Sequence, residues 1–267
     1  DNGGNHDMLG ARAHLVYVSD DNFKSHLIID TTSQDQQTQP NVLAAFDGTQ
    51  IFPSFYNGFV ASQTASSCCT ANKDIDRSSN SDLTKDEVDT FGISWSNSWE
   101  LGSSTFKSIT GYRDLESEQF RDSDNSALPF FSVGTQIEHD QTSQEFIFSG
   151  TSKDSSLDWI LGAYYFQEDT FHGTDVTVGE GLFRSLSSLP YSITLFPGGP
   201  PLAFLAIPFD LSLRYDRNQK VTSKALYAHS TYSMTDQLRL TLSARYTKDE
   251  KEMSMYTIKR ASQVPII

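Results

Sequence analysis

The chain has 267 residues and a formal net charge of −14, because 34 acidic side chains outnumber 20 basic ones. Phosphate binding needs clustered Lys and Arg, so this balance argues against nucleic acid as a partner. No stretch approaches the roughly 20 apolar residues of a membrane-spanning helix, but a barrel strand needs only about 9–11 residues. The length suits one large domain or two ordinary ones, and composition alone leaves a transmembrane β-barrel open.

Eight stretches of alternating apolar and polar residues predict eight β-strands. In the last of them Leu238, Leu240 and Leu242 alternate with polar side chains at strict period two. No helical periodicity of comparable length competes with this pattern. The strands are expected at residues 10–19, 23–32, 88–101, 105–122, 137–151, 157–170, 218–233 and 238–253.

The connections between these strands alternate in length. Tight polar turns are expected within each pair, at residues 20–22, 102–104, 152–156 and 234–237, and long segments between pairs, at about 33–87 and 171–217. Most connections in compact domains have about 4–6 residues. Outer-membrane barrels instead alternate short periplasmic turns with long extracellular loops. The sequence therefore predicts an all-β, antiparallel, up-and-down transmembrane β-barrel.

Aromatic residues bracket the apolar parts of the strands. Trp99 and Trp159 lie beside short turns, while Tyr112, Phe166 and Tyr246 lie further along their strands. Outer-membrane barrels carry aromatic girdles at both membrane interfaces. These five residues are accordingly expected to mark the two edges of a lipid-facing band.

Three segments resemble the barrel of TonB-dependent outer-membrane receptors. They are residues 105–113 (TFKSITGYR), 157–166 (LDWILGAYYF) and 238–252, the last centred on SARYT. The resemblance covers most of the chain from about residue 88 onward. It implies a 22-stranded barrel closed by an N-terminal plug, with residues 1–267 as the N-terminal part of the barrel domain. Both ends of the sequence look cut, so a fragment without the plug and the C-terminal strands is expected.

The resemblance also implies a function. Such receptors reside in the outer membrane of Gram-negative cells and take up a scarce nutrient, most often a ferric siderophore, with energy delivered by a TonB partner. Two alternatives stay open: a passive porin-like channel and a soluble secreted β-sandwich or adhesin. Enzymatic activity and a cofactor are not expected, because the chain has no Gly-x-Ser-x-Gly elbow and no Gly-rich phosphate loop.

Basic residues on the polar side of the predicted strands are the candidate lumen-facing groups. They are Arg12, Lys107, Arg113, Arg239 and Arg245. One role is the attraction of an anionic ligand, and the other is ion pairing with acids of the plug or of neighbouring strands. We favour ion pairing, since the interior of such barrels is polar throughout.

Cys68 and Cys69 are adjacent in the first long segment. A vicinal disulfide and a pair of free thiols are both open, since a cell-surface setting is oxidising. A zinc site requires further Cys or His ligands at suitable spacing, and none lies near this pair. The six histidines are scattered through the chain without paired spacing, so no metal site is expected.

Overall fold

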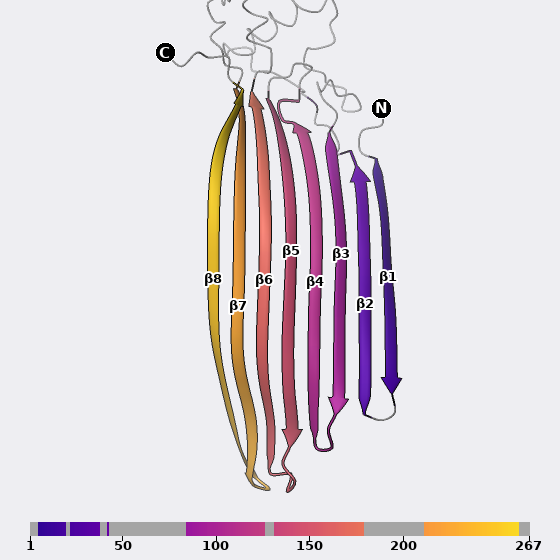
Figure 1. The fold of residues 1–267 in the computed structure, drawn as a ribbon, viewed down its shortest axis with the longest axis vertical. Helices are drawn as coiled ribbons and strands as arrows, with labels where there is room; N and C mark the ends of the chain where they lie inside the picture. The colour runs from indigo at the N-terminus through magenta and orange to yellow at the C-terminus, as the bar shows by residue number, and fades with distance from the viewer. Residues whose placement is uncertain are drawn as a thin grey trace, which may run out of the picture.

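The computed structural model describes residues 5–19, 22–37, 42, 84–125, 131–178 and 211–261. Eight strands lie side by side in chain order in a single antiparallel sheet (Figure 1). The predicted all-β, up-and-down arrangement is therefore confirmed. The strands are β1 (His6–Ser19), β2 (Phe23–Gln36), β3 (Lys85–Glu100), β4 (Ser104–Asp122), β5 (Phe131–Thr151), β6 (Leu157–Val178), β7 (Leu211–Thr235) and β8 (Leu238–Ala261).

The strand ends at the short turns match the sequence prediction, whereas the opposite ends run further than predicted. β6 continues to Val178 and β7 begins at Leu211, both inside the segment predicted as a connection at 171–217. β2 likewise reaches Gln36 and β3 begins at Lys85, inside the segment predicted at 33–87. These extensions do not continue the apolar face, although their backbones stay paired. Those of β2 and β3 are polar, and Val176 on β6 pairs with Leu213 on β7 on the side of the polar face.

The short turns contain residues that allow the chain to reverse direction within a few positions. Gly102, between β3 and β4, has a φ of 73°, in the left-handed region that glycine adopts without steric cost. In the turn between β5 and β6, the hydroxyls of Ser152 and Ser156 donate hydrogen bonds to Asp154. These bonds favour the ionised carboxylate and lower the pKa of Asp154 to about 2.

The pairing register divides the side chains between two faces of the sheet. One face, called the apolar face, carries Leu15, Leu27, Ile93, Phe106, Phe146, Leu161, Leu226 and Leu242. The opposite face, called the polar face, carries Arg12, Asp30, Ser94, Arg113, Glu145, Tyr227 and Arg245. The alternation seen in the sequence thus becomes two chemically different surfaces.

Neither face is covered by the described residues. Ala225, at 4% exposed, is the one buried hydrophobic side chain among them, whereas Leu15 is 64% and Leu242 is 62% exposed. A β-sandwich would bury such side chains under a second sheet, and all eight described strands belong to one sheet. In this part of the chain, no helix is both long and apolar enough to cross a membrane.

Aromatic rings cross the apolar face near the short turns. Tyr17, Phe23, Trp99, Phe106 and Phe146 follow one another over β1 to β5, with ring centroids 5.1–6.3 Å apart. Phe148 and Trp159 extend this series to β6, at 4.8 Å. We refer to these seven residues as the lower aromatic row.

A second set of rings, the upper aromatic row, lies further from the short turns on the same face. It consists of Phe91, Tyr112, Tyr165 and Tyr246. Phe166, which was predicted for this position, instead lies on the polar face, where its ring stacks on Tyr164 at 6.5 Å. Residues 164–166 are all aromatic, so the sequence does not show which of them faces outward, and the pairing with β7 decides it.

The two aromatic rows bound an apolar band. Trp99 and Phe91 are eight residues apart on β3, which corresponds to about 26 Å along a strand. Beyond the upper row the same face becomes charged, with Asp89, Asp114, Asp140, Asp169 and Glu250. The apolar face is therefore a band of limited height rather than a face of the whole sheet.

Candidate ligand-facing surface

All five basic residues predicted to face the lumen share the polar face. Arg12 lies on β1, Lys107 and Arg113 lie on β4, and Arg239 and Arg245 lie on β8. The structure does not gather them into one site, because they are spread across that face from β1 at one edge of the sheet to β8 at the other. Arg12 and Arg113 take part in one cluster, and Arg245 takes part in another.

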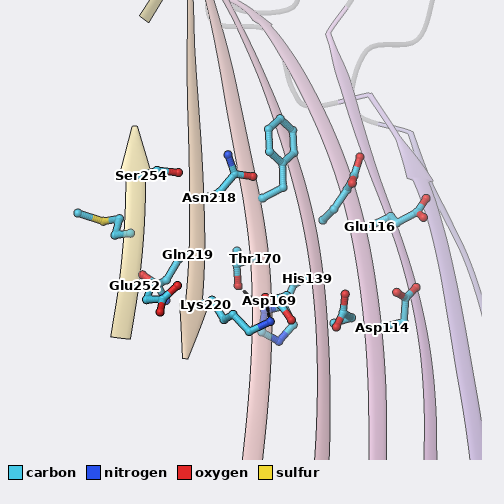
Figure 2. A pocket seen from close by; sticks show the side chains of 14 residues that line it. Asp114, Glu116, His139, Asp169, Thr170, Asn218, Gln219, Lys220, Glu252 and Ser254 are labelled. Atoms are coloured by element: carbon cyan, nitrogen blue, oxygen red, sulfur yellow. Dashed lines mark hydrogen bonds and ion pairs between the residues drawn. The ribbon is translucent and has the colours of Figure 1, made fainter. Parts of the chain in front are cut away.

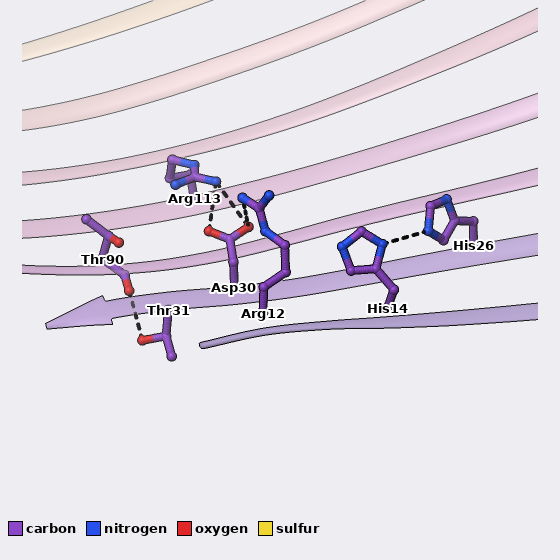
Figure 3. Close-up of polar contacts among 7 residues, drawn as sticks. All are labelled: Arg12, His14, His26, Asp30, Thr31, Thr90 and Arg113. Atoms are coloured by element: carbon purple, nitrogen blue, oxygen red, sulfur yellow. Dashed lines mark hydrogen bonds and ion pairs between the residues drawn. The ribbon is translucent and has the colours of Figure 1, made fainter. Parts of the chain in front are cut away.

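The first cluster is formed by Arg12, Asp30 and Arg113, from β1, β2 and β4 (Figure 3). Asp30 Oδ2 lies 3.2 Å from Arg113 Nη2, and Asp30 Oδ1 lies 3.8 Å from Arg12 Nη2. Arg113 reaches over Gly92 on β3, where an added Cβ would come within 2.8 Å of Arg113 Nη2. The missing side chain at Gly92 therefore makes room for an ion pair between strands that are not neighbours.

The second cluster crosses β5 to β8. Tyr227 donates a hydrogen bond to Glu145 Oε1 at 2.9 Å, and the Arg245 guanidinium lies 5.8 Å from the centroid of the Tyr227 ring. A Cβ added at Gly162 would overlap that ring, so glycine is what lets Tyr227 lie across β6. A cation over an aromatic face is attracted by the quadrupole of the ring.

Lys107 and Arg239 differ from Arg12 and Arg113, which both pair with Asp30. Neither makes an ion pair with another residue in the described part of the chain. The polar face thus contains both paired and available positive charges. The attraction of an anionic ligand by these groups stays a prediction.

Sequence reasoning missed the residues that organise the two clusters. Asp30 and Arg113 are 83 positions apart in the chain, and Glu145 and Tyr227 are 82 apart. Such pairs can be found only from the strand register, which no single strand reveals. The available signal was Gly92 and Gly162, each a glycine at a polar-face position of a strand interior.

The remaining predicted site residues are not placed by the structure. Cys68 and Cys69 lie outside the described residues. Within the described ranges, no group of three or more His, Cys, Asp or Glu side chains is arranged to hold a metal ion.

A hollow of about 500 Å³ lies over β4 to β8, beyond the upper aromatic row (Figure 2). Its acidic lining residues are Asp114, Glu116, Glu138, Asp140, Asp169 and Glu252. Lys220 lies among them, with Nζ 3.5 Å from Asp169 Oδ1. The register places these carboxylates on the same side as the apolar face, opposite the two basic clusters. We therefore do not assign the hollow to the ligand-facing surface.

The family model described as TonB dependent receptor-like, beta-barrel matches residues 22–259. The chain belongs to this family. The membership predicted from three short segments is thereby confirmed. No curated protein matches the sequence of this receptor barrel.

Two solved structures resemble this receptor barrel. The ferric yersiniabactin uptake receptor FyuA from Yersinia pestis matches with a TM-score of 0.61 at 11% identity, over 96% of this chain and 32% of FyuA. The siderophore receptor PiuA from Acinetobacter baumannii gives a TM-score of 0.41 at 12% identity, over 96% of this chain and 40% of PiuA. The likeness to FyuA shows a shared fold, and the chain spans about a third of the length of FyuA.

Proposed function

We propose that this chain forms part of the wall of an outer-membrane receptor in a Gram-negative cell. The receptor takes up a scarce nutrient, which we propose is a ferric siderophore, with energy delivered by TonB. The observation that carries the proposal is the two-faced sheet of a TonB-dependent receptor-like barrel, apolar and uncovered on one side and polar on the other.

The apolar face suits contact with lipid. Its band extends about 26 Å along the strands between the aromatic rows, or about 19 Å in height at a tilt near 45°. Aromatic side chains at both edges of such a band are typical of outer-membrane barrels. The carboxylates beyond the upper row then lie in the polar region outside the hydrocarbon, where their charge is not desolvated.

The polar face suits an anionic ligand in the lumen. Lys107 and Arg239 carry positive charges that no described residue neutralises, while the acidic hollow lies on the other side of the sheet. Charge lining a confined, water-filled space attracts ligands of opposite sign. Ferric siderophores with carboxylate or catecholate groups are anionic, and FyuA, a solved structure that shares this fold, is described as a ferric yersiniabactin uptake receptor.

Uptake by intact cells tests this proposal. Cells with and without the full-length gene would be supplied with radiolabelled ferric chelates, in strains with and without TonB. We expect saturable iron accumulation that requires both the gene and TonB. Accumulation that requires the gene but not TonB would favour the porin-like channel, and accumulation independent of the gene would contradict iron uptake altogether.

Extraction behaviour tests the membrane location separately. The full-length protein is expected in the outer-membrane fraction and to run at a different gel mobility before and after boiling, as a folded barrel does. A protein that is soluble without detergent would instead support the secreted adhesin alternative.

A further inference from the structure

His14 on β1 and His26 on β2 meet on the polar face, next to the Arg12, Asp30 and Arg113 cluster (Figure 3). His26 Nε2 lies 3.4 Å from His14 Nδ1, and the ring centroids are 5.5 Å apart. The register sets His14 opposite Ile28 and His26 opposite Val16, so the two histidines are diagonal neighbours. Their sequence positions differ by 12, which is why no spacing pattern revealed the pair.

The other four histidines have different partners. His229 contacts the Ser243 hydroxyl at 2.7 Å, and His139 contacts the Thr170 hydroxyl at 2.9 Å. His6 contacts a Gln36 oxygen and His172 contacts the Arg217 guanidinium. Within the described ranges, which include all six histidines, only His14 and His26 bring two ring nitrogens together.

The separation of these nitrogens suits a shared metal ion. Zinc binds imidazole nitrogen at about 2.0–2.1 Å in tetrahedral geometry, which places two ligand nitrogens about 3.3–3.4 Å apart. The 3.4 Å between His26 Nε2 and His14 Nδ1 matches that value. The χ2 torsion of histidine is soft, so rotation of the rings can turn both lone pairs from one another toward a shared ion.

The surroundings leave the remaining coordination positions open. In the described part of the chain no third His, Cys, Asp or Glu completes a metal-binding group. Asp30, in the neighbouring cluster, is already engaged by Arg12 and Arg113. Positive charge nearby, from Arg12 and Lys24 on the same face, repels a bare divalent cation, so binding is favoured when an anionic group fills the open positions.

We propose that His14 and His26 form a two-imidazole site for a divalent transition-metal ion such as Cu²⁺, Ni²⁺ or Zn²⁺. Imidazole suits these ions, and the order of affinity for such a site places Cu²⁺ first. Water or an anionic chelating ligand completes the coordination. This inference goes beyond ferric siderophore uptake and does not depend on it, because a ferric chelate with all six positions filled offers no place for imidazole.

Copper titration of the full-length receptor in detergent tests the site, after removal of bound metal with a chelator. The electron paramagnetic resonance spectrum is expected to show Cu²⁺ with nitrogen splitting from two imidazoles. His14→Ala and His26→Ala are each expected to lower the affinity of that Cu²⁺ more than about tenfold, since loss of a group that merely orients a ligand already costs about 10–100-fold.

His229→Ala is the matched control, because His229 also lies on the polar face but pairs with a hydroxyl. It is expected to leave the two-nitrogen copper signal and its affinity unchanged. Gel mobility before and after boiling establishes that each variant is folded. Should a variant fail to fold, the nitrogen count in the unaltered protein decides the question.

Two results would overturn the proposal. One is a copper spectrum without two imidazole nitrogens in the unaltered receptor. The other is equal copper affinity in the unaltered protein and in folded His14→Ala and His26→Ala variants. Either result would leave the two rings joined by a hydrogen bond alone, and neither would affect the test of iron uptake.

Discussion

The half of the sheet near the short turns and the half beyond the upper aromatic row share one backbone arrangement but differ in their side chains. Near the turns, Leu161 and Leu242 face one way while Glu145 and Arg245 face the other. Beyond the upper row both faces carry charged groups, although the strands stay paired without interruption in β6. The backbone pairing is therefore the same in both halves of the sheet, and only the side chains differ between the apolar band and the charged region beyond it.

The largest expected effect comes from placing a charge inside the apolar band. Leu242→Arg should lower the free energy of unfolding in lipid vesicles by about 2–4 kcal/mol, because a cation on the lipid face loses hydration near the bilayer centre. Thr222 lies on the same side of the sheet beyond the upper row. Thr222→Arg should cost only about 0–1 kcal/mol. Equal costs, measured by guanidinium titration, would place both positions in the same medium.

The next effect concerns Gly162, which lies under the Tyr227 ring. Gly162→Ala should cost about 1–3 kcal/mol, because the added methyl overlaps the ring and forces it off its rotamer. Gly10→Ala is the control, since a Cβ there meets nothing closer than 3.7 Å. The same guanidinium titration separates them, and a variant at Gly162 as stable as the one at Gly10 would show that the ring moves freely.

A smaller effect on stability is expected from removing the negative charge of Asp30, which lies between Arg12 and Arg113. Asp30→Asn should cost about 1 kcal/mol, because both guanidiniums lose their carboxylate but stay partly hydrated. Asp35→Asn, at an exposed position on the same strand, should change the unfolding midpoint little. If both substitutions have the same effect, the Asp30 cluster adds nothing to stability.

The smallest effect is a pH dependence at a short turn. The serine hydroxyls lower the pKa of Asp154 from 3.8 to about 2. A lowered pKa stabilises the folded state above pH 3.8, and this contribution disappears as pH falls toward 2. The difference in guanidinium midpoint between the unaltered protein and Ser152→Ala should accordingly shrink between pH 5 and pH 2. Lys153→Ala, in the same turn, should show no such trend.

The sequence predicts the half of the sheet near the short turns better than the half beyond the upper aromatic row. Alternation such as that of Leu238, Leu240 and Leu242 exists only where one face meets an apolar medium, so the strand ends at the short turns were placed well. Beyond the upper row the apolar side chains no longer stay on one face, and the sequence predicts connections where β2, β3, β6 and β7 continue. The prediction that Phe166 belongs to the upper aromatic row was wrong for a related reason. Residues 164–166 are all aromatic, so the sequence shows no alternation between the two faces there.

For the polar face, the sequence predicts which basic residues lie on it but not which residues they contact. All five basic residues share it, but their partners lie on other strands and follow from the register rather than from local sequence. The pair of His14 and His26 was missed for the same reason. A search for glycine at polar-face positions would have pointed to Gly92 and Gly162, and through them to the long side chains that cross above.

The strand order determines which strands must pair when the sheet forms. Every backbone pairing between described strands joins chain neighbours, from β1 with β2 to β7 with β8. Each strand pairs only with the strands before and after it in the chain, although connections such as the one between β2 and β3 separate the paired residues by many positions. Each strand added along the sequence thus covers the edge of the strand before it and presents a new edge to the strand that follows.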